Sequence, residues 1–399
     1  MASRGRAAAF LTIFVILSLA IAFAAGEIFV RVAGRYDEDG TFFFRERPIP
    51  PFSLPVKHAQ RLIDEYHADP TGYMQYDPDL GWTNRPGSCT RDKRYCANSA
   101  GLRSDREFTK ERAAGVLRIS LFGDSFIHGH DVDLPGSVAP QLETALAARG
   151  IKAEALNFGV GGFGMDQAYL RYSRDDAKFE SDIVVMGLQF ENIGRHLMVF
   201  RLIAYPQTAI PFSKPRYYFA GPSLLLTNKP TVAPEKIPET LANFHLSPLR
   251  RFETFYTEKY QPRWFLRSRL VGVIVDGVRR RRAEAAPNLG DPEGEGVRVT
   301  RRILEMFRND VRVTNRPFLL VYLPLKDNIQ AQLEGRGDPA EPLVSLFRHD
   351  FDLIDPSARL VALARERGAE AVAPGHYSAE GNRAVAEAVA EKIASLKLE

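Results

Sequence analysis

The chain has 399 residues, of which 45% are hydrophobic, and its formal net charge is +4. This length accommodates one large α/β domain with additions, or two domains, and so small a charge, spread along the chain, gives no indication of nucleic-acid binding. The two cysteines, Cys89 and Cys96, are too few for a zinc ribbon or a scaffold of several disulfides.

The N-terminus carries a hydrophobic segment. Two arginines precede an uncharged apolar run over residues 7–26, which is long enough to cross the hydrocarbon core of a bilayer. One interpretation is an uncleaved anchor over residues 1–30, and the other is a cleaved signal peptide with a site of the A-x-A type at Ala22-Phe23-Ala24. The length of the run favours a single-pass anchor in the inner (cytoplasmic) membrane. The basic flank then places the rest of the chain outside the cytoplasm, in the periplasm.

Residues 31–97 are predicted to be an extracytoplasmic connector. Residues 31–70 contain a proline-rich stretch and are expected to be irregular apart from one helix over residues 56–66. In an oxidising compartment, Cys89 and Cys96 are expected to form a small loop-closing disulfide, with two separate reduced thiols as the alternative.

From residue 98 onward, apolar strands alternate with amphipathic helices. The predicted strands are 117–122, 153–158, 182–189 and 317–324, and the predicted helices are 138–149, 165–177, 298–313, 358–367 and 379–396. Strands separated by helices pair in parallel through right-handed crossovers. The sequence therefore predicts a three-layer α/β/α sandwich with a parallel, flavodoxin-like sheet, built from residues 98–193 and 297–399.

Residues 194–296 interrupt this alternation and are predicted to be a mainly helical insertion. The insertion has an aromatic, proline-containing stretch at 215–219 and a helical region at 248–282 with ten Lys/Arg against three Asp/Glu. It is interpreted either as a solvated helical lobe, or as a cap over the site or a basic face toward anionic lipid or polysaccharide.

Polar residues follow the ends of several predicted strands, where ligands bind in an open parallel sheet. Ser125 follows the first strand, a glycine-rich turn at 159–164 follows the second, and Asn192 follows the third. His376 precedes the last helix and supplies the base that a serine nucleophile needs. Backbone N–H groups at Ser125 and in the glycine turn, with the Asn192 amide, would stabilise an oxyanion. Taken singly, each of these residues also fits a turn or a helix cap.

No metal or cofactor is predicted. His128, His130 and Asp131 are close in sequence, but a third histidine at a useful spacing is missing. The glycine turn follows the second strand and has no acidic partner for a ribose, which argues against a dinucleotide.

The ordered set GDSF, NFGVGGFG, an Asn after the third strand and a His before an EGN-containing helix resembles the SGNH hydrolases, also called GDSL-type esterases. YDPDLGW, NSAGLR and the hydrophobic N-terminus resemble the membrane-anchored bacterial members. The resemblance implies Ser125 as the nucleophile and an oxyanion donor. It implies Gly162, five residues after Asn157, as the second donor, Asn192 as the third donor, and His376 as the general base.

Two positions depart from the family pattern. The family usually has an Asp two or three residues before the His, where this chain has Ala373 and Pro374. The nearest upstream acid is Glu370, in a predicted strand; an acid such as Asp355 from another loop, or a backbone carbonyl that orients a Ser–His dyad, are the other sources. The family's Gly-x-Asn-Asp is altered too, since only its Asn has a match.

The sequence thus predicts an extracytoplasmic SGNH-type esterase that hydrolyses an O-acyl ester, such as O-acetyl on an envelope polysaccharide, through an acyl-serine on Ser125. The same groups would serve an O-acyltransferase acting on envelope glycans. A catalytically weak or inactive SGNH-fold binding protein is the alternative of another class, and the missing Asp supports it.

Overall fold

The computed structural model describes residues 2–260, 263–281 and 290–396. Its largest sheet has five parallel strands in the spatial order β12-β11-β8-β6-β7. The strands are β6 Leu117–Phe122, β7 Ala153–Asn157, β8 Ile183–Leu188, β11 Phe318–Tyr322 and β12 Leu353–Ile354. The first strand of this set lies between the second and the third, which is the flavodoxin-like order, so the predicted fold class is confirmed.

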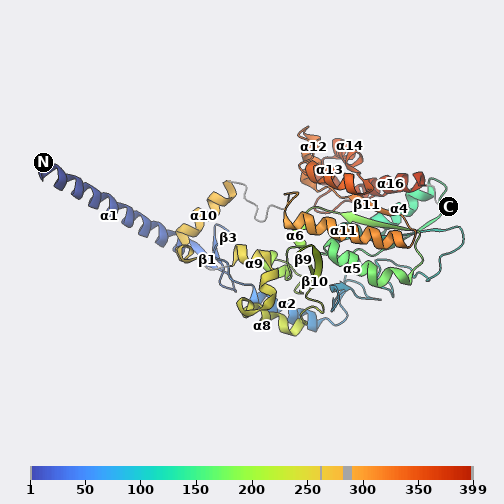
Figure 1. The fold of residues 1–399 in the computed structure, drawn as a ribbon, viewed down its shortest axis with the longest axis horizontal. Coiled ribbons are helices and arrows are strands. Elements are labelled where there is room, and N and C mark those ends of the chain that lie inside the picture. Colours follow the sequence, from blue (N-terminus) through green and yellow to red (C-terminus); the bar gives the residue numbers. More distant parts are fainter. Residues whose placement is uncertain (1, 261–262, 282–289, 397–399) are drawn as a thin grey trace.

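Helices cover both faces of this sheet (Figure 1). One face packs against α4 Val138–Ala147, α12 Lys326–Leu333, α14 Ser357–Arg367, α15 Ala369–Val372 and α16 Ala379–Ser395. The other packs against α5 Met165–Asp175 and α11 Glu295–Val313, and α13 Glu341–Asp350 adds side chains to the core on that side. Successive strand residues alternate between the two cores, as Val184 and Val185 of β8 show.

The four predicted strands and five predicted helices of the core are present, with ends displaced by at most three residues. The strand β12 was not predicted, because two residues are too short to show a period-2 pattern. The strand predicted at Glu370 is wrong: Glu370 lies in the single-turn helix α15, which follows Gly368 at the end of α14.

The N-terminal helix α1 Ala2–Ala33 projects from the body of the molecule (Figure 1). Its Ala9–Ala33 part is long and apolar enough to cross a membrane, a property that signal sequences share. An antiparallel sheet of β1 Gly34–Tyr36, β2 Phe42–Phe44 and β3 Arg47–Ile49 follows, so the prediction of an irregular segment there is wrong. The Asp37 carboxylate closes the β1–β2 turn by accepting from the N–H of Thr41, and Phe42 packs against Val30 of α1.

The rest of the connector contains α2 Val56–Ala68 and the hairpin of β4 Met74–Asp77 and β5 Gly81–Asn84. The predicted helix at 56–66 is therefore present and two residues longer at its C-terminal end.

The predicted insertion contains a hairpin as well as helices. Its elements are α6 Asn192–Arg195, α7 Arg201–Ala204, β9 Arg216–Ala220, β10 Ser223–Thr227, α8 Ile237–Ala242, α9 Thr254–Lys259 and α10 Arg269–Arg281. The aromatic stretch at 215–219 is mainly β9. The predicted helical region 248–282 is divided into several separate helices, of which α10 is the longest; residues 261, 262 and 282 of that region lie outside the described residues. Phe200, Phe244 and Tyr256 are buried in the core that covers the α5–α11 face. The segments of the insertion that carry these three residues therefore pack on the sheet domain.

The helix α10 of the insertion lies against the end of α1 (Figure 1). The Glu27 carboxylate of α1 accepts from the Ser268 hydroxyl at 2.7 Å and from the N–H of Leu270 at 2.8 Å. Leu270 also packs with Val30 and Phe42. The basic helix thus borders the segment that is apolar enough to cross a membrane.

Glu253 joins two segments of the insertion and gives a pH-dependent prediction. Its buried carboxylate accepts from the N–H groups of Val199 at 2.7 Å and Phe200 at 2.9 Å, and burial raises its pKa from 4.5 to about 7. The folded chain therefore holds this proton more tightly than the unfolded chain, so its contribution to stability is present below pH 4.5 and declines as the pH rises to about 7. Glu253→Gln should remove this decline, so its Tm relative to wild type should rise between about pH 5 and about pH 8. An unchanged Tm difference would contradict the assignment.

Candidate active site

Ser125 lies where the chain leaves β6 and begins α3 Ser125–His128. The Asp124 carboxylate caps this helix by accepting from the N–H of Phe126 at 2.9 Å. Gly129 has a φ of +83° and ends the helix after one turn. The Ser125 side chain is therefore held on a short, capped turn at the carboxyl edge of the sheet, as predicted.

The predicted nucleophile and base are brought together. Nε2 of His376 lies 2.9 Å from Oγ of Ser125, and Nδ1 of His376 lies 2.8 Å from Oδ2 of Asp131. An ionised carboxylate can only accept hydrogen bonds, so Nδ1 carries the proton toward Asp131. Nε2 is then the acceptor for the Ser125 hydroxyl, which is the arrangement that a general base requires.

Partial burial is the largest single effect and acts to raise the pKa of Asp131, but hydrogen bonding and charge interactions with His376, together with the charge interaction with His130, outweigh it, so the pKa lies below its usual value. The carboxyl is therefore ionised at neutral pH. Its side chain is 50% exposed, whereas the His376 side chain is 25% exposed. Of these two side chains, that of Asp131 is thus the more exposed to solvent.

The loop that carries His376 is fixed by its neighbours. The hydroxyl of Tyr377 donates to the carbonyl of Pro324 at 2.7 Å, and the Ser378 side chain caps α16. The ring of Phe126 lies 5.0 Å from the ring of His376. Packing and hydrogen bonds on both sides therefore hold the imidazole near Ser125.

The acids that the sequence suggested do not orient His376. Glu370 pairs with Lys326 at 2.7 Å and Asp355 pairs with Arg348 at 2.9 Å. A backbone carbonyl is not the partner either, because Asp131 takes that place. The sequence contained one signal for Asp131: Gly129 ends the helix one turn after Ser125, so the chain turns back beside the nucleophile.

Asn192 begins α6 four residues after the end of β8, at the same edge of the sheet. Its Nδ2 donates to Oδ2 of Asp124 at 2.9 Å, and Nη1 of Arg195 lies 3.4 Å from the same oxygen. The Asn192 residue is 1% exposed. Asp124, the residue before Ser125, thus fixes the orientation of the Asn192 side-chain amide.

Gly162 lies in the glycine turn after β7, with a φ of +80° that favours glycine. Nε1 of Trp82 donates to the carbonyl of Gly161 at 2.9 Å and so holds this turn from the YDPDLGW segment. A Cβ on Gly159 would lie 2.3 Å from the backbone nitrogen of His128, so the turn packs directly on α3.

The three residues weighed as metal ligands do not form one group. Nε2 of His128 lies 2.8 Å from the hydroxyl of Tyr73, and burial lowers the pKa of His128 well below its usual value. His130 and Asp131 instead share their surroundings with His376, and one donor atom from each lies within 4.8 Å of the others. This set could hold a cation only if His376 gave up one of its two ring hydrogen bonds.

Cys89 and Cys96 form a disulfide that closes a short loop. The loop lies close to the site, because the hydroxyl of Tyr95 accepts from the N–H of Asp131 at 3.0 Å.

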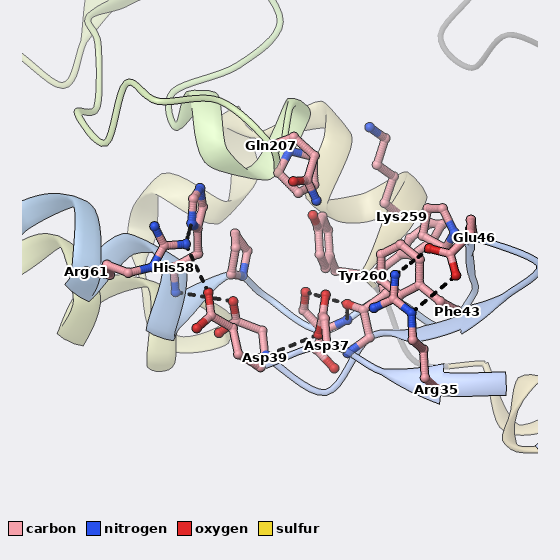
Figure 2. A pocket seen from close by; sticks show the side chains of 17 residues that line it. Arg35, Asp37, Asp39, Phe43, Glu46, His58, Arg61, Gln207, Lys259 and Tyr260 are labelled. Carbon is pink, nitrogen blue, oxygen red and sulfur yellow. Dashed lines mark hydrogen bonds and ion pairs between the residues drawn. The ribbon is translucent and has the colours of Figure 1, made fainter.

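A cavity of about 640 Å³ lies elsewhere, between the connector and the insertion (Figure 2). Asp37 and Asp39 line one side of it, and Lys259 and Tyr260 come from the insertion. Several of its charges are satisfied within the wall, as in the pair of Arg35 with Glu46 at 2.6 Å. Its lining includes none of the residues that contact Ser125 or His376.

No protein-family model and no curated protein matches the chain. Among solved structures, the chain is similar to a lipase/acylhydrolase from Enterococcus faecalis at 12% identity, over 71% of this chain and 98% of that chain, with a TM-score of 0.36. It is similar to the acetyl xylan esterase AlAXEase at 15% identity, over 69% and 100%, with a TM-score of 0.35. It is similar to a member of the lipolytic G-D-S-L family from Veillonella parvula DSM 2008 at 13% identity, over 70% and 100%, with a TM-score of 0.32. The chain resembles the SGNH hydrolases in the order of its four sequence blocks along a flavodoxin-like sheet.

Proposed function

We propose that the protein is an SGNH-type serine esterase in which Ser125, His376 and Asp131 form the catalytic triad. The observation that carries the proposal is the continuous chain of two hydrogen bonds from Oγ of Ser125 through the imidazole to the carboxylate of Asp131. A serine hydroxyl is a weak nucleophile until a base accepts its proton, and an acid behind the base fixes the tautomer of the imidazole.

Acylation follows from this geometry. Oγ of Ser125 attacks the carbonyl carbon of the ester while Nε2 of His376 takes its proton, and the ionised Asp131 stabilises the imidazolium that results. The tetrahedral intermediate collapses when His376 returns the proton to the departing alcohol oxygen, which leaves an acyl group on Ser125. Water, activated by the same imidazole, then releases the acid; a sugar hydroxyl in its place would make the protein an O-acyltransferase.

The oxyanion is assigned to the N–H groups of Ser125 and Gly162 and to the amide of Asn192. One N–H of the Asn192 amide is used on Asp124, and this bond aims the other. Asn192→Ala is expected to lower kcat by about 10²-fold, because one of three preorganised donors is lost. Steady-state kinetics on an aryl ester test this, with Asn228→Ala in the insertion as the matched control. If Asn192→Ala keeps the wild-type kcat, the assignment of Asn192 to the oxyanion hole is wrong.

The compartment suggests the substrate. The α1 helix would anchor the chain in the inner membrane with the remainder in the periplasm, and a short O-acyl group such as O-acetyl on an envelope polysaccharide is the substrate we propose there. The alternative of an inactive binding protein was supported by the missing Asp before His376. Asp131 can take the role of that Asp, because it contacts Nδ1 of His376.

The test uses the full chain in detergent micelles. Wild type should release p-nitrophenol from p-nitrophenyl acetate and acetate from an O-acetylated polysaccharide. His376→Ala should abolish both, whereas His349→Ala, at an 88% exposed histidine side chain, should retain them. If wild type neither hydrolyses esters nor transfers acetyl to a glycan acceptor, while a control esterase reacts, the proposal is wrong.

A further inference from the structure

Asp131, the proposed acid of the triad, has an unusual backbone conformation. Its φ is +67°, in the left-handed region that residues other than glycine seldom adopt. Its side chain is half exposed, so packing alone does not fix it. A residue in such a conformation persists when its surroundings hold it there. The groups that hold the Asp131 backbone therefore decide whether its carboxylate reaches His376.

The loop between Cys89 and Cys96 supplies these groups. The hydroxyl of Tyr95 accepts from the N–H of Asp131 at 3.0 Å, and the guanidinium of Arg94 donates to the carbonyl oxygen of Asp131. Both peptide groups that flank the Asp131 Cα are thus bonded to neighbouring residues of one loop. The Nε of Arg94 also lies 3.5 Å from Oδ1 of Asp133.

The ring of Tyr95 reinforces this contact. It stacks on the ring of His130 with centroids 5.0 Å apart and an interplanar angle of 26°. The guanidinium carbon of Arg103 lies 4.8 Å from the Tyr95 ring centroid. Arg103 in turn donates to the carbonyl of Val132 at 2.6 Å and to the carbonyls of His128 and Gly129. Tyr95 is therefore enclosed between the Asp131 loop and the arginine that braces it.

The disulfide gives the loop a fixed shape. Within the closed ring, the N–H of Thr90 donates to the carbonyl of Tyr95 at 2.8 Å, and the N–H of Tyr95 donates to the Thr90 hydroxyl at 3.1 Å. A disulfide limits the conformations open to the segment it closes. Without it, Arg94 and Tyr95 would lie on an exposed turn with more freedom.

We propose that the loop Cys89–Cys96 is a clamp that positions Asp131 for the reaction, with Tyr95 and Arg94 as its positioning residues. The clamp holds the N–H and carbonyl of Asp131 so that its carboxylate accepts from Nδ1 of His376. It explains how a half-exposed acid from a loop can replace the acid that the family places beside its histidine. The proposal extends the proposed function, because the clamp acts on the acid of the triad.

The first test compares three variants with wild type. Tyr95→Phe removes one acceptor, and paired Cys89→Ala and Cys96→Ala open the loop. Arg91→Ala is the matched control, because Arg91 lies in the same loop and its side chain is 91% exposed beside Asp69. Loss of one neutral hydrogen bond should lower kcat by about three- to tenfold in Tyr95→Phe, with KM unchanged. The open-loop variant should lose at least as much, and the control should keep wild-type kcat.

A second measurement separates positioning from a general loss of structure. In an Asp131→Ala background, Tyr95→Phe should lower kcat no further, because the group that it positions is gone. An additive loss, or a rise in KM in place of the fall in kcat, would overturn the clamp. If the open-loop variant does not fold, Tyr95→Phe decides alone.

A third measurement does not depend on substrate. The Nδ1 proton of His376 should give a downfield proton resonance in wild type that Asp131→Ala removes and that Tyr95→Phe and the open-loop variant broaden or remove. If the resonance behaves in this way and the protein hydrolyses no ester, the proposed function fails while the clamp stands. If wild type is active and both loop variants keep its resonance and its kcat, the clamp is wrong.

Discussion

Replacing Asp131 with alanine is expected to lower kcat on an aryl acetate by about 10³- to 10⁴-fold, with little change in KM. Nδ1 of His376 would lose the carboxylate that fixes its proton, so part of the population would hold the wrong tautomer toward Ser125. The imidazolium formed on attack would also lose its counter-charge. Neither effect requires a contact with bound substrate, which is why KM should hold.

The control for this variant is Glu370→Ala. Glu370 is the nearest acid upstream of His376, but its carboxylate pairs with Lys326. Its removal should leave kcat at the wild-type value. Loss of activity in Glu370→Ala with retention in Asp131→Ala would reverse the assignment of the acid.

Replacing Ser125 with alanine should lower kcat by about 10⁶-fold, because the hydroxyl that forms the acyl intermediate is lost. The burst of p-nitrophenol that accompanies acylation should disappear with it. Ser120→Ala is the matched control, because Ser120 is a fully buried serine on β6, the strand that leads to Ser125. A burst that survives in Ser125→Ala would show that another residue carries the acyl group.

The sheet domain could be predicted because its signals are local. Each core strand is a run of apolar residues, and each helix repeats its apolar positions every three to four residues, so pattern alone separates them. The strands β1 to β3 and β12 have two or three residues each, too few for any period to appear. Their formation depends on tertiary contacts, such as that of Phe42 with Val30.

The site, too, contains residues that local sequence predicts and a contact that it does not predict. Ser125, Gly162 and Asn192 each lie within five residues of the end of a strand, so the rule for parallel sheets places them at one edge. His376 and Asp131 are 245 positions apart in the sequence, and a pattern of apolar residues cannot predict a contact over such a separation. The family pattern directed attention to the residues just before His376. The carboxylate that contacts His376 comes instead from Asp131, in the turn after Ser125, where the loop Cys89–Cys96 supports a backbone conformation that sequence spacing does not reveal.

The central claim is that Ser125 is the nucleophile of a working triad, and covalent labelling tests it most directly. The full-length protein is treated with a serine-directed phosphonate, and the modified residue is located by peptide mass spectrometry. We predict a single label on Ser125 in wild type, slower labelling in Asp131→Ala, and none in Ser125→Ala. A label on another residue, or none on wild type under conditions in which a control esterase reacts, would contradict the assignment.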